Sequence, residues 1–343
     1  MARLATSERV VPFRAGDGFE CNLIHVRGER RPGRGPVLLI HGSGVRANIF
    51  RAPVETNIVD ALLARGYDVW LENWRASIDF APNEWTLDEA AVHDHPAAVA
   101  TVRRQTGAER LKAIIHCQGS TSFMMSAVAG LVPEVDTIVS NAVSLHPEVP
   151  LGSFFKAELS VDLLSKLIRY LDPQWARRAP GLVPKLIKLF VRLTHHECDN
   201  MVCKLSSFTY GTGRPTLWLH ENLNEATHEW LKDELAHVPL TFFRQIRACL
   251  EAGHLVSVAG LEELPASFVD EPPKTDARFA FFAGEENVCF VPDSQQRTFD
   301  WLDALAPGKH SLHRIPGYSH LDIFMGEHAA RDVYPRLLAA LED

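Results

Sequence analysis

The chain has 343 residues, a formal net charge of −8 and 46% apolar residues, a composition typical of a globular protein with a sizeable core. Its acidic balance argues against a nucleic-acid-binding surface, since such a surface needs clustered basic residues. No apolar run reaches the roughly 18 residues of a membrane span, and residues 1–15 lack the apolar core of a signal peptide. Six scattered cysteines form no dense disulfide framework, so we expect a cytoplasmic protein with reduced thiols.

Short apolar strands alternate with helices along the first 140 residues. An N-terminal hairpin turns at Asp17-Gly18, and the apolar runs that follow predict buried strands separated by helical stretches. This alternation favours a mostly parallel, doubly wound sheet with helices on both faces. The predicted strands cover 9–13, 19–26, 37–40, 67–73, 111–115 and 135–140. The predicted helices cover 54–65, 88–106 (interrupted by Pro96) and 120–129.

The alternation stops between residues 147 and 272. Helical runs and turn clusters in this block predict a mostly helical insertion, a lid, and not a separate domain. The helical runs lie at 161–171, 183–193 and 239–252, and the later strands and the last helix at 278–284, 310–315 and 331–342. We therefore expect a core made of residues 1–146 and 273–343, with the lid at 147–272.

A sharp turn joins the strand 111–115 to the helix that follows it. Its sequence is Ile115-His116-Cys117-Gln118-Gly119, with one nucleophilic side chain and a glycine two residues later. This is the form of a nucleophile elbow, in which a strand-to-helix turn lifts the attacking atom above the sheet. The usual pattern is Gly-x-Ser-x-Gly, so Cys117 replaces the serine and Ile115 the first glycine. Alone, Cys-x-Gly is a weak signal, because such a cysteine is usually a small buried hydrophobe.

Four predicted strand ends carry reactive groups. Because reactive groups collect at the carboxyl ends of parallel strands, we expect these segments to meet. Their order along the chain is an oxyanion loop, a nucleophile, an acid and a histidine, which matches the α/β-hydrolase arrangement. The segments are His41-Gly42-Ser43-Gly44, Cys117, Glu285-Glu286-Asn287 and His320.

The first roles follow from acyl-transfer chemistry. Cys117 is expected to attack as a thiolate, and His320 to remove its proton and later supply it to the leaving group. The backbone N–H groups of Ser43 and Gln118 are expected to stabilise the oxyanion. The structural alternative for His320 is a loop histidine that caps the next helix.

The histidine also needs a partner that holds it in one tautomer, the role of the carboxylate in a catalytic triad. Glu286 is our choice for this acid, and Glu285 is the second choice. Asn287 stays open as a third candidate, because asparagine orients the histidine in papain-like thiol enzymes.

A second cluster of potential ligands lies in the predicted lid, in the run from His195 to Cys203. Four potential metal ligands fall within nine residues, but no further cysteine–histidine pair follows at zinc-finger spacing. We therefore predict a lid turn or a cysteine pair here, with no metal and no other cofactor in the protein.

Three motifs carry a resemblance to a known family. They are Trp70-Leu71-Glu72-Asn73-Trp74-Arg75-Ala76-Ser77, His116-Cys117-Gln118-Gly119-Ser120-Thr121 and Pro316-Gly317-Tyr318-Ser319-His320-Leu321-Asp322. The chain resembles an α/β-hydrolase along nearly its full length, and these motifs resemble the hydrolase region fused to GMC-type, cholesterol oxidase-like oxidoreductases. The lid phrases Cys198 to Cys203 and Leu223 to His228 are similar to that group too. No Gly-x-Gly-x-x-Gly is present, so no redox role is carried over.

The resemblance implies an α/β-hydrolase fold and a cysteine variant of its triad. Cysteine nucleophiles also occur in dienelactone hydrolases and polyhydroxyalkanoate synthases, which resemble this fold and hold acyl groups as thioesters. We expect an acyl hydrolase whose small-molecule substrate is an apolar ester, thioester or lactone. The alternatives are an acyltransferase or cyclase with the same chemistry and a non-catalytic ligand-binding protein. The oligomeric state is left open.

Overall fold

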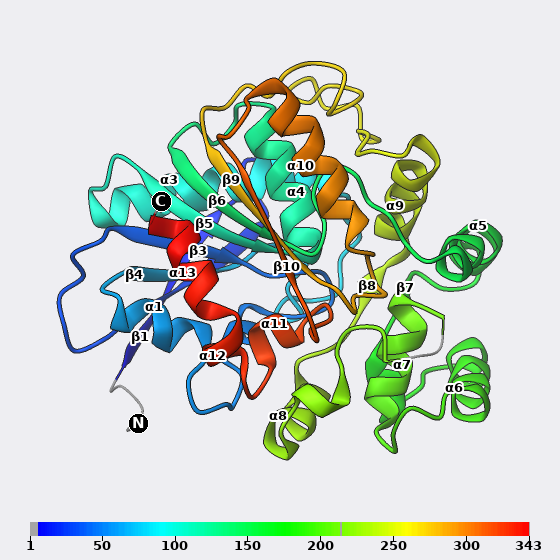
Figure 1. Ribbon diagram of the computed structural model, residues 1–343. Coiled ribbons are helices and arrows are strands. Elements are labelled where there is room, and N and C mark those ends of the chain that lie inside the picture. The colour runs from blue at the N-terminus through cyan, green and yellow to red at the C-terminus, as the bar shows by residue number, and fades with distance from the viewer. Residues whose placement is uncertain (1–5, 213–214, 343) are drawn as a thin grey trace.

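The computed structural model describes residues 6–212 and 215–342 (Figure 1). The outermost residues of the predicted core, 1–5 and 343, and residues 213–214 of the predicted lid lie outside the described residues. Within the described chain, no helix is long and apolar enough to cross a membrane.

In the described residues, eight strands form one sheet in the order β1-β2-β4-β3-β5-β6-β9-β10. The hairpin β1–β2 is antiparallel and joins β4 antiparallel, whereas every pairing from β4 to β10 is parallel. The predicted strands are confirmed, and the sheet is that of the α/β-hydrolase fold. Their bounds are β1 Ser7–Arg14, β2 Glu20–Arg27, β3 Pro36–Ile40, β4 Asp68–Asn73, β5 Leu111–His116, β6 Val135–Asn141, β9 Arg278–Gly284 and β10 Ser311–Ile315.

Helices cover both faces of this sheet (Figure 1). One apolar cluster packs α1, α11, α12 and α13 against the sheet, and a second packs α2, α3, α4 and α10 against it. Alternate residues of the buried strands, such as Leu38 and Leu39 in β3, belong to opposite clusters. The helices are α1 Ile58–Ala64, α2 Leu87–Glu89, α3 His95–Thr106, α4 Cys117–Val128, α10 Asp293–Leu305, α11 Asp322–Met325, α12 Ala329–Asp332 and α13 Tyr334–Glu342.

Two predicted helices differ from the structure at identifiable residues. The helix predicted from residue 54 begins at Ile58, because Asn57 forms a capping box with Asp60. The stretch 88–106 is not broken at Pro96: a π-helical turn, Ala90–Asp94, joins α2 to α3. Pro96 lies in the first turn of α3, where its missing N–H is not needed.

The chain between β6 and β9 leaves the sheet and forms mainly helices, shown at the right of Figure 1. We call residues 147–272 the insertion. Its predicted helix at 161–171 was misplaced, because α5 ends at Ser165, and helices α7 and α8 were not predicted. Its elements are α5 Leu151–Ser165, β7 Tyr170–Leu171, α6 Leu182–Thr194, α7 Met201–Tyr210, α8 Glu225–Trp230, β8 Val238–Pro239 and α9 Leu240–Ala252.

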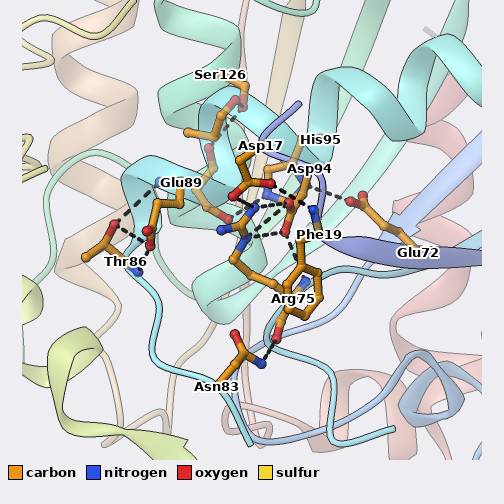
Figure 2. A network of polar contacts seen from close by, with 12 residues as sticks. Asp17, Phe19, Glu72, Arg75, Asn83, Thr86, Glu89, Asp94, His95 and Ser126 are labelled. Carbon is orange, nitrogen blue, oxygen red and sulfur yellow. Dashed lines mark hydrogen bonds and ion pairs between the residues drawn. The ribbon is translucent and has the colours of Figure 1, made fainter. Parts of the chain in front are cut away.

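A buried ionic network holds the loop that follows β4 (Figure 2). The Arg75 guanidinium donates to both carboxylate oxygens of Asp94 at 2.7–3.1 Å and to Asp17 at 2.8 Å. Asp94 is fully buried, so the network fixes this loop against the start of α3. The neighbouring residue Trp74 donates its indole N–H to the carbonyl of His41 at 2.9 Å. The network thereby supports the loop after β3, which belongs to the site.

Candidate active site

The turn between β5 and α4 has the geometry of a nucleophile elbow. Cys117 has a φ of 55°, a strained left-handed conformation for a residue with a side chain. A β-carbon at Gly42 would lie 2.8 Å from that of Cys117, so glycine lets the loop after β3 approach Cys117. Ile115 does not prevent the turn, because its side chain is fully buried in the apolar cluster that contains α4.

Two backbone N–H groups converge on the Cys117 sulfur. They belong to Gln118 and Ser43, the two predicted oxyanion donors. Burial raises the pKa of the Cys117 thiol to about 12, although these two hydrogen bonds favour the thiolate. In this closed site Cys117 is therefore a neutral thiol at pH 7.

His320 lies in the loop after β10, beside the elbow. The Cys117 sulfur, one ring nitrogen of His116 and one ring nitrogen of His320 lie within 4.8 Å of one another. Nε2 of His320 is buried and has no hydrogen-bond partner among the residues that the structure describes, so thiol and imidazole are close but not hydrogen-bonded. Burial lowers the pKa of His320 to about 3. The resting pair is neutral, not a thiolate–imidazolium ion pair.

The structure does not bring the predicted acid to the histidine. Glu285 and Glu286 are both exposed, and no hydrogen bond joins either side chain to His320 among the described residues. The reason is local: their backbone N–H groups bond to the carbonyls of Ile315 and Tyr318, and the side chains project from the turn into solvent. The expected position of Glu286 beside His320 is therefore corrected: its side chain lies in solvent and makes no hydrogen bond to the histidine among the described residues.

Asn287, the third candidate, occupies the position beside His320. Its Nδ2 lies 3.2 Å from Nδ1 of His320, and the side chain is 2% exposed. Its Oδ1 accepts backbone hydrogen bonds from Cys289 at 3.0 Å and Phe290 at 3.2 Å. These two bonds fix the orientation of the amide, so Asn287 donates to His320 Nδ1. The remaining proton of a neutral imidazole then resides on Nε2.

Three residues at the site had no role in the prediction. His116 precedes the nucleophile, and its ring lies 4.7 Å from that of His320 between centroids. Asn141, at the end of β6, donates to Nδ1 of His116 at 2.9 Å. Tyr210, at the end of α7, donates its hydroxyl to the carbonyl of Ser43 at 2.9 Å. Only His116 carried a sequence signal, its position next to Cys117.

Two cavities meet near the nucleophile. The chamber at Cys117 has a volume of about 10 Å³, roughly room for one water molecule. A second pocket, about 80 Å³, reaches Gln118 from the insertion and has mostly apolar walls. Tyr210 lines both cavities. The apolar pocket and the chamber at Cys117 therefore share Tyr210 as a wall.

Comparisons with known proteins agree with this fold. A family model described as alpha/beta hydrolase fold matches residues 35–186. Human lipase member K is 24% identical over 362 residues, 95% of this chain and 86% of that protein. Sterol esterase 2 of Saccharomyces cerevisiae is 25% identical over 199 residues, but the match covers only 36% of that protein.

Solved structures show the same fold at low identity. A lipase in its open form has a TM-score of 0.60 and 16% identity, with 98% of each chain covered. DcsB in complex with its substrate analogue has a TM-score of 0.58 and 14% identity, with 98% of this chain and 99% of that chain covered. The chain thus has the α/β-hydrolase fold, and its sequence is similar to those of lipases and esterases.

Proposed function

We propose that the protein is an acyl hydrolase that cleaves an apolar carboxylic ester through a thioester on Cys117. The observation that carries this proposal is the convergence of two backbone N–H groups on a buried sulfur held at a strained elbow. Such donors stabilise the oxyanion of an acyl-transfer intermediate. The resemblance to the hydrolase region of GMC-type oxidoreductases is part of this proposal, as is a cytoplasmic location, whose reducing conditions would keep a catalytic thiol reduced.

The reaction follows from these positions. The Cys117 thiol gives up its proton to water as its sulfur attacks the ester carbonyl carbon, and the carbonyl oxygen becomes an oxyanion held by the N–H groups of Ser43 and Gln118. The carbon–oxygen bond to the alcohol then breaks, and the departing alkoxide takes that proton back from the protonated water and leaves as the alcohol. Water hydrolyses the thioester in the second half, through a second oxyanion at the same donors.

Cysteine suits a site whose histidine has an amide partner. The Asn287 amide donates to Nδ1 of His320, so the proton of the neutral imidazole lies on Nε2 and the ring is a poor base in this tautomer. A thiol is far more acidic than a serine hydroxyl, so it needs a weaker base to react. We therefore propose a Cys117–His320–Asn287 constellation in place of one that contains Glu286.

The surface of the insertion supports a lipid-like substrate. Both α5 and α6, at the outer side of the insertion in Figure 1, expose large apolar side chains at helical spacing. Isolated apolar side chains on a surface are ordinary, whereas a continuous stripe indicates a contact with another apolar phase. The exposed residues are Leu151, Phe155, Leu159, Leu163, Leu182, Leu186, Leu189, Phe190 and Leu193, each at least 52% exposed.

Trapping the intermediate tests the proposed nucleophile. After a p-nitrophenyl ester of a medium-chain fatty acid is mixed with the protein, mass spectrometry is expected to find one acyl group on Cys117. Cys117→Ala should lose both the adduct and ester turnover, whereas Cys249→Ala, which removes another buried thiol, should keep both. Turnover by Cys117→Ala at the wild-type rate would refute the proposal.

Acyl transfer is a second candidate, favoured by the small chamber at Cys117. Its walls include Val45, Leu217, Leu235 and Leu321, and it has space for about one water molecule. A thioester in such a place meets little water and persists until another nucleophile arrives. In the same assay, faster turnover with an added alcohol or amine than with water alone would select transfer over hydrolysis.

The exposed stripe predicts a difference between two forms of substrate. Leu159→Asp and Leu186→Asp should lower activity on an emulsified long-chain ester at least tenfold, because a charge opposes entry into an apolar phase. Activity on a soluble short-chain ester should stay within twofold, since both side chains are exposed in the folded protein. The matched control is Leu305→Asp on α10, which should leave both activities unchanged. Equal losses on both esters would contradict a role at a lipid surface.

A further inference from the structure

Four side chains of the insertion come together although they are far apart in the sequence. Cys198 precedes α7, Cys203 lies in its first turn, His220 lies in a short 3-10 turn, and His228 lies in α8. One sulfur or ring nitrogen from each lies within 4.8 Å of the others. We propose that these residues form a zinc site.

The chemistry of the four groups matches Zn²⁺. Two thiolates and two imidazoles form a Cys₂His₂ set, which binds zinc tetrahedrally in closed structural sites. With Zn–S near 2.3 Å and Zn–N near 2.0–2.1 Å, neighbouring ligand atoms are about 3.3–3.8 Å apart. Sγ of Cys203 and Nε2 of His220 are 3.5 Å apart, within this range. Both cysteines are free thiols, so neither is committed to a disulfide.

The surroundings hold the ligands in place. Oδ1 of Asn200 accepts the backbone N–H groups of Val202 and Cys203, which fixes the turn between the two cysteines. Its Nδ2 donates to the carbonyl of His228 at 3.4 Å, which ties this turn to α8. Nε2 of His228 is buried without a hydrogen-bond partner among the described residues. A metal ion would satisfy this nitrogen, whose burial otherwise costs free energy.

The sequence prediction of a lid turn missed this group for a clear reason. Within the run from His195 to Cys203, only the two cysteines belong to the group, and His196 and Asp199 are exposed. The two histidines come from a segment 17 and 25 residues after Cys203. Zinc-finger spacing places the two histidines closer together than His220 and His228 are, so the motif was not recognisable.

The site connects the insertion to the catalytic loop. Beside His220, Leu219 donates its N–H to Asp322, and Asn222 donates to Asp322 and to the carbonyl of Gly317. These contacts reach the loop that carries His320. Zinc would therefore hold α7, α8 and this loop together, as a structural ion that leaves no coordination position for substrate.

Metal analysis of the intact protein tests the site. Protein purified without chelators is expected to contain about one zinc per chain, measured by plasma mass spectrometry. Cys203→Ser and His228→Asn should reduce this at least tenfold, whereas His196→Asn, an exposed neighbour, and Cys117→Ala should retain it. The zinc content of Cys117→Ala separates this proposal from the proposed activity, since only the activity depends on Cys117.

A spectroscopic measurement on the wild-type protein tests the metal site even where the ligand variants do not fold. Wild-type protein loaded with Co²⁺ should show a thiolate-to-cobalt charge-transfer band and the strong visible absorption of tetrahedral cobalt. Two results would overturn the proposal: wild-type protein that binds neither zinc nor Co²⁺, or a Cys198–Cys203 disulfide found by non-reducing peptide mapping of the purified protein.

Discussion

Replacing Asn287 by aspartate is expected to raise kcat/KM for ester hydrolysis about 100-fold, since general-base catalysis contributes on the order of 10²–10⁴. One carboxylate oxygen would keep the two backbone hydrogen bonds from Cys289 and Phe290. The other would accept a proton-bearing Nδ1 of His320, which frees Nε2 to act as a base. The opposite change, from aspartate to asparagine in a serine protease triad, imposes the wrong tautomer and is severely inactivating.

The pH profile distinguishes this explanation from a change in packing. Burial now lowers the pKa of His320 to about 3, and a carboxylate beside Nδ1 would favour the imidazolium and raise that pKa. The acid limb of kcat/KM should therefore move to higher pH in Asn287→Asp. Glu286→Gln should leave rate and profile unchanged, because that side chain is exposed. If Glu286→Gln lost activity and Asn287→Asp gained none, the original choice of Glu286 would be right after all.

Replacing Arg75 by alanine is expected to lower the free energy of unfolding by about 3–5 kcal/mol, the usual result of leaving a buried partner charge unpaired. Arg75 is 4% exposed and Asp94 is fully buried, so water cannot replace the lost ion pair (Figure 2). Urea denaturation at pH 7 measures the change. The matched control is Arg14→Ala, which removes an exposed pair with Glu20 and should cost at most about 1 kcal/mol.

A second comparison separates the charge from the contact. In Asp94→Asn with Arg75→Met, both charges are gone, so the double variant should recover much of the lost stability, as buried pairs replaced by apolar groups often do. If Arg75→Ala were as mild as Arg14→Ala, the network would not be a major source of stability. The role of the network would then be limited to positioning two loops, the one after β4 that contains Trp74 and the one after β3 that contains His41.

Where the sequence prediction succeeded, the signal was local. Runs such as Val37–Ile40 are apolar at every position because both faces of a central parallel strand are buried. Cys117 and Gly119 mark the elbow because the turn needs two things at fixed positions after the strand. The first is a residue in the left-handed conformation, Cys117, and the second is a glycine where the backbone of the loop after β3 comes close. Ser43 and Gln118 stay predicted oxyanion donors, a prediction that rests on an oxyanion loop after an early strand and a second donor directly after the predicted nucleophile.

Where the prediction failed, the outcome depended on the direction of side chains in irregular segments. Glu285, Glu286 and Asn287 are adjacent, and each is a chemically acceptable partner for a histidine. The backbone hydrogen bonds of the turn after β9 expose the first two and bury the third. No periodicity encodes this choice, because the turn belongs to neither a helix nor a strand.

The sequence by itself therefore determined the α/β architecture and the sharp turn at Cys117, because apolar periodicity and turn chemistry are local properties of the chain. Only the tertiary structure decided that Asn287 lies beside His320 and that Cys198, Cys203, His220 and His228 converge. Those arrangements arise when segments far apart in the chain pack against each other, and the free energy that selects them comes from burial and hydrogen bonds that exist only in the folded protein.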